Sequence, residues 1–488
     1  MKRLLISIIT LLLLSAIFTG CATNPASNKS EFVLMSEQTE LKIGQQLSIM
    51  VAKQMRLLPK DDPLVRYVDK VGQRVAATSD RPELFYRFHV VDDGAINAFA
   101  LPGGYIYVHR GLLAHFNSEA ELAAVLGHEI GHVTARHAVQ RHTQSQAYNI
   151  GLAVTSIFIP IPYAVANLSS LLAQSIILGY GREQELHSDE LSLKYLSNAG
   201  YDVTATIRLL ETLERLDAIK KKEKSDAGEK IKTYHGAFSS HPKTKKRIQQ
   251  AIAKAASTQK TGLNRVGRDA MLAALDGYPI KDSSKDGAIV GRRFLHPDLG
   301  IQLEFPENWV ITNTPAALNA RIRKKKVYFR LGMKELRKRQ SAEAVLRTLF
   351  SSRHIKSVST GKHQGYSYAR STIMASAPHV SQAAIDANVF LDGPRAFIIL
   401  LYSERTESGK YQIQFDRIRN SFRPYDIAKD GDVPKIRAYI WKRGDSWKKI
   451  AKRGNLILGR FTADKLAALN GMDLDDSPVP GTITKNIR

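Results

Sequence analysis

Residues 122–137 read Leu-Ala-Ala-Val-Leu-Gly-His-Glu-Ile-Gly-His-Val-Thr-Ala-Arg-His and contain the pattern H-E-x-x-H. Residues four apart lie one turn apart on the same face of a helix, so His128 and His132 can bind one metal ion together. Glu129 would then face the open side of the metal, where a carboxylate can take a proton from water. Neutral imidazoles suit zinc, and three protein ligands with a water form a hydrolytic site. The stretch therefore predicts a zinc-dependent hydrolase with one Zn²⁺.

The third ligand distinguishes two kinds of zinc peptidase. A metzincin needs Gly and His where this chain has Ala135 and Ala138, so that interpretation fails. A gluzincin takes a Glu from a second helix, and Glu185 with Asp189 one turn later provides a suitable pair. Glu185 would bind the metal, while Asp189 would accept the N–H of a ligand His and hold its tautomer. His187 is the competing ligand, although it lies on another face of that helix.

Local signals around the motif predict the surroundings of the catalytic helix. Amphipathic helices are expected at residues 36–53 and 63–78, and both should pack onto the catalytic helix. Ser118 should start that helix with a capping box, because Glu121 follows three residues later. His137 lies on a basic, polar turn and is expected to be structural or solvent-facing.

Two strands are expected beside the helix, at residues 86–91 and 98–108. Zinc peptidases commonly bind substrate as an added strand along a sheet edge. Asn97, Gly104 and Tyr105 are therefore candidate substrate-binding residues, with the substrate extended along the Tyr105 strand. Gly104 would allow another backbone to approach closely. A plain hairpin without substrate contact is the alternative.

The N-terminus has the features of an exported lipoprotein. Residues 1–20 combine a basic start with an apolar run that is too short to span a bilayer, which predicts a lipoprotein signal peptide. Cys21 is the single cysteine of the 488 residues, so no internal disulfide can form, and lipidation of Cys21 explains its presence. Ala22 after the cysteine indicates sorting to the outer membrane. Residues 21–35 are expected to be a tether.

The chain is strongly basic, with 71 Lys and Arg against 46 Asp and Glu and a formal net charge of +25. Such a balance indicates anionic partners, either nucleic acid, a membrane surface or a cell-wall polymer. Export and anchoring would separate the protein from nucleic acid, so nucleic acid is not an expected partner. The mostly apolar residues 148–178 are expected either to cover the active site or dip into the membrane interface as a helical hairpin, or to be plain core helices.

The rest of the sequence predicts further domains, so the expected fold class is multidomain. A mainly α zincin domain with a small β-sheet would occupy residues 36–255, followed by a linker at 256–286. Residues 287–426 alternate strands and helices and resemble an α+β PsbP-type binding module. Residues 434–488 resemble a small α/β LysM module without a clear closing strand, and such modules bind peptidoglycan. A degenerate structural repeat is the alternative.

Four motifs in order resemble the gluzincin family of HtpX-type and CAAX-prenyl proteases, most closely its periplasmic, β-barrel assembly-enhancing members. They are His128-Glu129-x-x-His132, Glu185-x-x-x-Asp189, the Asn97-Ala-Phe-Ala-x-Pro-Gly-Gly strand, and Ser240-His241-Pro242 with Arg247. The resemblance covers residues 38–255 and implies Zn²⁺ on His128, His132 and Glu185, with Glu129 as general base and acid. The chain departs from the family pattern at two positions: it has Gly181 where the family usually has Ser, and Ser188 where the family commonly has Ala.

His241 is a candidate catalytic residue of this family pattern. Its imidazole could stabilise the oxyanion, occupy the open metal position and silence the enzyme, or cap the following helix. We expect an endopeptidase on the periplasmic face of the outer membrane that acts on unfolded or misassembled envelope proteins. The alternatives are an envelope chaperone or scaffold with a closed metal site, and a cell-wall hydrolase, for which the motif is a poor match.

Overall fold

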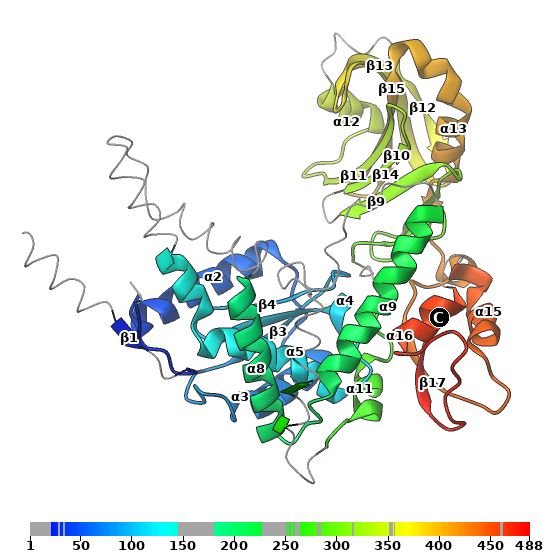
Figure 1. The fold of residues 1–488 in the computed structure, drawn as a ribbon. Coiled ribbons are helices and arrows are strands. Elements are labelled where there is room, and N and C mark those ends of the chain that lie inside the picture. Colours follow the sequence, from blue (N-terminus) through cyan, green and yellow to red (C-terminus); the bar gives the residue numbers. More distant parts are fainter. Residues whose placement is uncertain are drawn as a thin grey trace, which may run out of the picture. The chain divides into compact units, whose positions relative to one another are not determined.

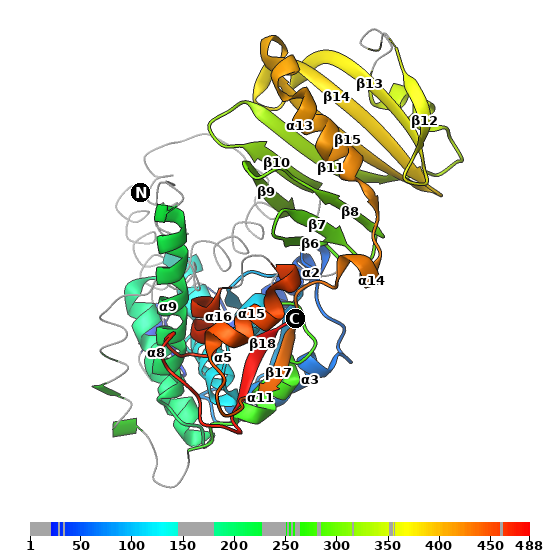
Figure 2. The same cartoon turned by 90° about the vertical axis from the view of Figure 1, so that its right-hand side faces the viewer.

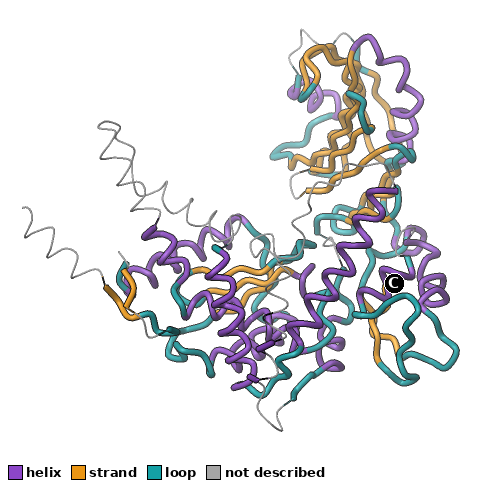
Figure 3. The backbone as a smooth tube through the Cα atoms, in the orientation of Figure 1, coloured by secondary structure: helices purple, strands orange, loops and turns teal. Residues whose placement is uncertain are grey.

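The computed structural model describes residues 21–27, 30–32, 35–144, 180–226, 250, 253–254, 257–258, 264–280, 285–314, 317–350, 355, 357–458 and 462–488. The predicted signal peptide at residues 1–20, the apolar segment at 148–178, and His241 lie outside these residues. The chain divides into two compact units, one of residues 1–280, 436–452 and 462–487, and one of residues 281–435, 453–461 and 488. Helices dominate the first unit and strands the second (Figure 3). None of the described helices is long and apolar enough to cross a membrane.

Helix α5 (Glu119–Thr134) carries the H-E-x-x-H motif, and every one of its residues is buried. Helices α3 (Pro63–Ala76) and α8 (Arg182–Asn198) pack against it, as the ribbon shows (Figure 1). The first unit also contains α2 (Glu37–Gln54), α4 (Arg110–Leu113), α9 (Ala205–Asp226) and α11 (Arg268–Leu275). The metal-binding motif therefore lies on a central helix rather than on a surface helix.

The start of α5 is capped almost as predicted. The hydroxyl of Ser118 accepts a hydrogen bond from the backbone N–H of Glu121 at 3.2 Å. The return bond differs, because the Glu121 carboxylate accepts from the backbone N–H of Asn117, at 2.7 Å, instead of that of Ser118. Two N–H groups that the helix itself leaves without partners are satisfied in this way.

The sheet beside α5 has three strands in the order β3-β5-β4. Strand β3 (Arg87–Val91) runs parallel to β5 (Tyr105–His109), and β4 (Ala98–Leu101) runs antiparallel to it. The single strand expected at residues 98–108 is thus a hairpin, since Gly103 and Gly104 turn the chain at φ of 77° and 88°. An added strand along Tyr105 is also excluded, because β5 is paired on both sides. Among the described residues, no strand pairs with the outer edge of β4, which lies next to α5 and on which α2 packs as well.

The residues expected to form a tether fold back onto α5. Strands β1 (Cys21–Thr23) and β2 (Ser30–Phe32) form an antiparallel pair. Just after β1, the buried amide of Asn24 donates a hydrogen bond to the carbonyl of Ala135 at 3.2 Å. The chain after Cys21 is therefore attached within a few residues to the C-terminal end of the catalytic helix.

Most of the C-terminal segment, residues 436–452 and 462–487, is part of the first unit. Its elements are β17 (Ile436–Ile440), α15 (Trp447–Leu458), α16 (Ala463–Leu469) and β18 (Ile483–Ile487), and the two strands pair antiparallel. Strand β18 provides the closing strand that the sequence did not reveal. The Lys485 ammonium is buried and donates to the carbonyls of Ala114 and Phe116, each at 3.0 Å. Strands β17 and β18 contact α11, and α16 contacts α9 (Figure 2).

The second unit is built on a seven-stranded antiparallel sheet in the order β12-β13-β14-β15-β11-β10-β9. Helix α13 (Ser408–Ser421) and helix α12 (Ala342–Leu349) belong to two separate apolar cores of this unit. Figure 2 shows α13 lying across the sheet. The strands are β9 (Trp309–Thr314), β10 (Ala317–Ile322), β11 (Val327–Glu335), β12 (Ser359–His363), β13 (Tyr366–Ala377), β14 (Val380–Asp392) and β15 (Arg395–Glu404).

A smaller sheet of the second unit has the order β16-β8-β7-β6. Its strands are β6 (Ala288–Val290), β7 (Arg293–His296), β8 (Ile301–Glu304) and β16 (Arg423–Pro424), followed by the short helix α14 (Ile427–Asp430). The predicted mixture of strands and helices in this part of the chain is confirmed. A turn of 3₁₀ helix, η3 (Arg405–Glu407), precedes α13.

Candidate metal centre

Close packing between α5 and α8 brings the predicted ligands together. A Cβ on Gly131 would lie 2.7 Å from Oγ of Ser188, and one on Gly127 would lie 2.9 Å from Cδ1 of Leu196. At Gly131 such a Cβ would also lie 3.2 Å from the backbone oxygen of Ser188, so the absence of a side chain there allows the two helices to approach this closely. Ser188 and Ser192 use the short distance to donate to carbonyls of α5, those of His128 and Ala124. Small residues on both helices therefore determine how near α8 lies to the motif.

Three side chains converge between these helices. His128, His132 and Glu185 form the one group among the described residues that could hold a metal ion. The Nε2 atoms of the two histidines are 3.1 Å apart. Glu185 places Oε2 3.6 Å from Nε2 of His128 and Oε1 3.6 Å from Nε2 of His132. All three residues are buried, so their polar atoms face one another and are shielded from bulk water.

Asp189 acts on His128 from one turn further along α8. Its Oδ1 lies 2.9 Å from Nδ1 of His128, the nitrogen opposite to the one that faces Glu185. Burial alone would lower the pKa of His128, but hydrogen bonds to Asp189 and Glu185 outweigh it and raise the pKa to about 10. The carboxylate thus orients the ring and makes it a more basic ligand. The structure places Asp189 where the spacing predicted it.

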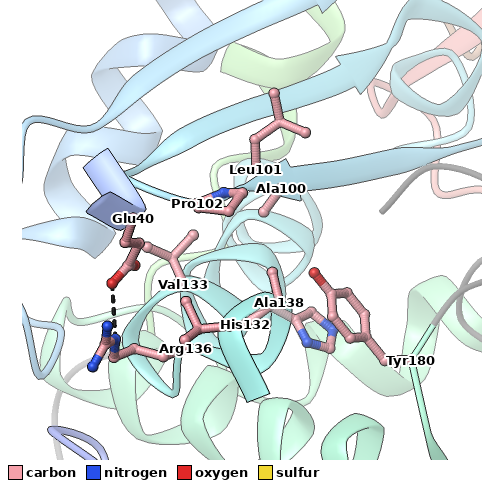
Figure 4. A pocket seen from close by; sticks show the side chains of 10 residues that line it. Glu40, Ala100, Leu101, Pro102, His132, Val133, Arg136, Ala138 and Tyr180 are labelled. Atoms are coloured by element: carbon pink, nitrogen blue, oxygen red, sulfur yellow. Dashed lines mark hydrogen bonds and ion pairs between the residues drawn. The ribbon is translucent and has the colours of Figure 1, made fainter. Parts of the chain in front are cut away.

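Glu129 is fully buried beside the first ligand and follows it directly on α5. Tyr180 lies nearby, with its ring stacked on the face of His132 at a centroid distance of 3.9 Å (Figure 4). Burial, and after it the charge of Glu129, holds the pKa of the Tyr180 phenol well above its usual value. Tyr180 was not expected at the site, because no local pattern distinguishes it from other aromatic residues.

His137 is a second residue that the sequence did not assign to the site. It was expected to be structural or solvent-facing, and the second alternative is wrong because His137 is 1% exposed. Its Nδ1 lies 2.8 Å from Nδ1 of His132. Burial, and then the charges of His187 and His128, lower the pKa of His137 to about 3, so its imidazole is neutral. His187, the competing ligand, contacts His137 and is not part of the metal-binding group.

The candidate substrate-binding residues are distributed along the β4–β5 hairpin. Ala100, Leu101 and Pro102, at the end of β4, line a small pocket together with His132 and Tyr180 (Figure 4). Asn97 precedes β4 and is buried, and its carbonyl accepts from the N–H of His109. Gly104 lies in the hairpin turn and Tyr105 is the first residue of β5, and neither lines that pocket. The structure therefore places β4, rather than Tyr105, beside the metal-binding group.

Comparison with solved structures gives only weak similarity. The solution structure of cyanobacterial PsbP from Synechocystis covers 28% of this chain and 95% of its own, with 13% identity and a TM-score of 0.23. Similarity at this level carries no argument about the second unit. The PsbP-type module and the LysM-like module remain predictions from sequence.

The peptidase region has clear relatives. Residues 64–255 match the sequence profile of peptidase family M48. Mitochondrial metalloendopeptidase OMA1 of Schizosaccharomyces pombe is 31% identical over 236 residues, 48% of this chain and 66% of that protein. The putative β-barrel assembly-enhancing protease of Vibrio cholerae is 34% identical over 165 residues, 31% of this chain and 34% of that protein. The chain thus spans between about a third and two thirds of the length of these relatives. Through the region that holds His128, His132 and Glu185, the chain belongs to peptidase family M48 and carries a metalloendopeptidase domain.

Proposed function

We propose that this protein is a zinc-dependent endopeptidase of the bacterial cell envelope that cleaves misfolded or stalled outer-membrane and periplasmic proteins. The observation that carries the proposal is the buried group of two imidazoles and one carboxylate, whose metal-facing atoms are 3.1 to 3.6 Å apart. Zn–N bonds of about 2.0–2.1 Å and Zn–O bonds of about 2.0–2.2 Å put the ligands of a tetrahedral site roughly 3.3–3.5 Å apart. The donor set therefore suits zinc in both chemistry and spacing.

The surrounding residues support hydrolysis of a peptide bond. A zinc ion held by this group would act as a Lewis acid that polarises the scissile carbonyl and acidifies a water molecule. Glu129 would take a proton from the attacking water and deliver it to the amine that leaves when the peptide C–N bond breaks. Asp189 keeps the ring of His128 oriented. The edge of β4 can bind an extended substrate through backbone hydrogen bonds, which suits unfolded chains because such bonds do not depend on sequence.

Location in the envelope is supported by the sequence and by the relatives. Residues 1–20 have the pattern of a lipoprotein signal, and Cys21 would carry the lipid that attaches the protein to the periplasmic face of the outer membrane. Several relatives are named β-barrel assembly-enhancing proteases. The partners would be unfolded or misassembled envelope proteins, the membrane and, through residues 434–488, peptidoglycan. Nucleic acid is not an expected partner.

The decisive experiment replaces the general base. The full chain is incubated with a denatured outer-membrane protein, with and without a chelator. Glu129→Gln should reduce cleavage about 10²–10⁴-fold while bound zinc stays at the wild-type level. Glu183→Gln is the matched control, because Glu183 is an exposed residue of α8 and its loss should leave cleavage unchanged. If Glu129→Gln retains the full biological activity in cells, the protein works as an envelope chaperone or scaffold and proteolysis is not its function.

A further inference from the structure

The chain turns in an uncommon way directly after the catalytic helix. Helix α5 ends at its C-cap, Ala135, and Arg136 then adopts a φ of 55°. A residue with a side chain rarely adopts this left-handed conformation, and such residues persist only where their surroundings hold them. The left-handed conformation of Arg136, close to the metal-binding group, must therefore be held by specific contacts.

A buried ion pair holds the turn. Nε of Arg136 lies 2.8 Å from Oε2 of Glu40 (Figure 4). Its Nη2 donates to the carbonyl of Met35 at 3.0 Å. The second oxygen of Glu40 pairs with Nη1 of Arg81 at 3.0 Å. Arg136 is 9% exposed and Glu40 is 1% exposed, so this ion pair is shielded from bulk water. We call Glu40 and Arg136 the turn clamp.

The turn directs the next residue back onto the metal-binding group. His137 places Nδ1 2.8 Å from Nδ1 of His132, and its Nε2 lies 3.3 Å from Nδ1 of His187 on α8. Without the left-handed step at Arg136 the chain would continue away from the helix end. The strained turn is thus what brings an acceptor to the second ligand.

The contacts assign the protons along this row of three rings. Nε2 of His132 faces Nε2 of His128 and Glu185, the other members of the metal-binding group. A metal bound at Nε2 requires that nitrogen to be free of a proton, so Nδ1 must then carry it. His137 then accepts at Nδ1 and carries its own proton on Nε2, which it donates to Nδ1 of His187. One tautomer of each ring then satisfies both the His132–His137 and the His137–His187 contacts.

We propose that His137 is a positioning residue of the metal centre, which holds His132 in the tautomer and orientation that metal binding requires, and that the turn clamp sets this contact. This inference rests on the proposed function, because it concerns the same centre. His137 does for the second ligand what Asp189 does for the first. A neutral acceptor is suitable there, since Glu185, Glu129 and Asp189 already bring three carboxylates to the centre, and a fourth would add repulsion between buried charges.

The test measures zinc affinity by competition with a chromogenic chelator, so it needs no peptidase activity. His137→Phe keeps an aromatic ring and removes the acceptor, and it should weaken zinc binding about 10–100-fold. His137→Gln offers a carbonyl oxygen and should recover part of the affinity. His142→Phe is the matched control, because His142 lies further along the same segment and no contact with the metal-binding group is described for it, and it should bind zinc as the wild type does.

Two further measurements separate positioning from a merely structural role. The visible absorption of bound Co²⁺ reports ligand geometry and should change in His137→Phe. A merely structural role would lower the melting temperature of the metal-free protein and leave that absorption as in the wild type. Glu40→Gln weakens the turn clamp and should reduce zinc affinity in the same direction by a smaller factor, and it serves if His137→Phe does not fold. Zinc affinity within twofold of the wild type in both His137→Phe and Glu40→Gln would overturn the inference. If cleavage is absent in the wild type but these affinities change as expected, the proposed function fails and this inference holds.

Discussion

Oδ1 of Asp189 lies 2.9 Å from Nδ1 of His128, and Asp189 follows the ligand Glu185 by one turn of α8. A single helix therefore supplies both a ligand and the group that orients another ligand. The position of α8 relative to α5 therefore determines the geometry of the whole metal-binding group. Four predictions test this dependence and the contacts that support α5.

Asp189→Asn removes the charge that makes His128 basic while keeping the size of the side chain. We expect zinc affinity to fall about 10–100-fold, because residues that orient metal ligands contribute at this level. Chelator competition on the purified chain measures it. Asp298→Asn, at an exposed position of the second unit, is the control and should show wild-type affinity. Equal affinity for zinc in Asp189→Asn and the wild type would contradict the assigned role.

Gly131→Ala tests the close approach of the two helices. Its Cβ would lie 2.7 Å from Oγ and 3.2 Å from the backbone oxygen of Ser188, so α8 must shift. Overpacking of this kind costs about 1–3 kcal/mol of unfolding free energy, and the shift should weaken zinc binding as well. Gly409→Ala in α13, where nothing lies within 4 Å, is the control. Urea unfolding should show it unchanged or slightly stabilised, and equal losses in both variants would argue against a packing effect.

Glu119→Gln tests a buried carboxylate in the first turn of α5. Burial raises its pKa, but hydrogen bonds from Tyr67, Tyr201 and Arg265 outweigh burial and hold the pKa below its usual value. A depressed pKa contributes stability above the unfolded-state pKa of about 4.3, and this stability is lost as pH falls through the folded-state pKa.

We therefore expect Glu119→Gln to lower the unfolding free energy at pH 7 by about 1–3 kcal/mol and to approach the wild type as the solution is acidified. Urea unfolding at a series of pH values measures the difference. A difference from the wild type that stays constant from neutral to acidic pH would show that the ionised carboxylate is not the cause.

Lys485→Ala tests whether the C-terminal segment supports the peptidase unit. Loss of the ammonium leaves the carbonyls of Ala114 and Phe116 without this donor, just before α5 begins. Each buried group left without a partner costs about 1–3 kcal/mol, so the melting temperature and the peptidase activity should both fall. Lys452→Ala, at an exposed position of α15, should change neither. Wild-type melting and activity in Lys485→Ala would instead favour an independent, detachable module.

The ligand set could be predicted from sequence because it depends on local periodicity. Residues four apart share a helix face in any fold, so His128 with His132, and Glu185 with Asp189, follow from spacing once both stretches are helical. The substrate strand was predicted less well. A Gly-Gly pair is compatible with a bend or with a hairpin turn, and only the pairing of β4 with β5 decides between them.

By itself, the sequence determined the chemistry of this protein: which side chains can bind a metal, which carboxylate can act as base, and the family of the peptidase region. The tertiary structure decided how these parts are supported. It brought α8 against the glycines of α5, returned His137 to His132 through the left-handed turn at Arg136, and placed Lys485 beneath the start of the catalytic helix. These contacts join residues through turns or across hundreds of positions, where no periodicity constrains the pairing, and packing alone selects the partner.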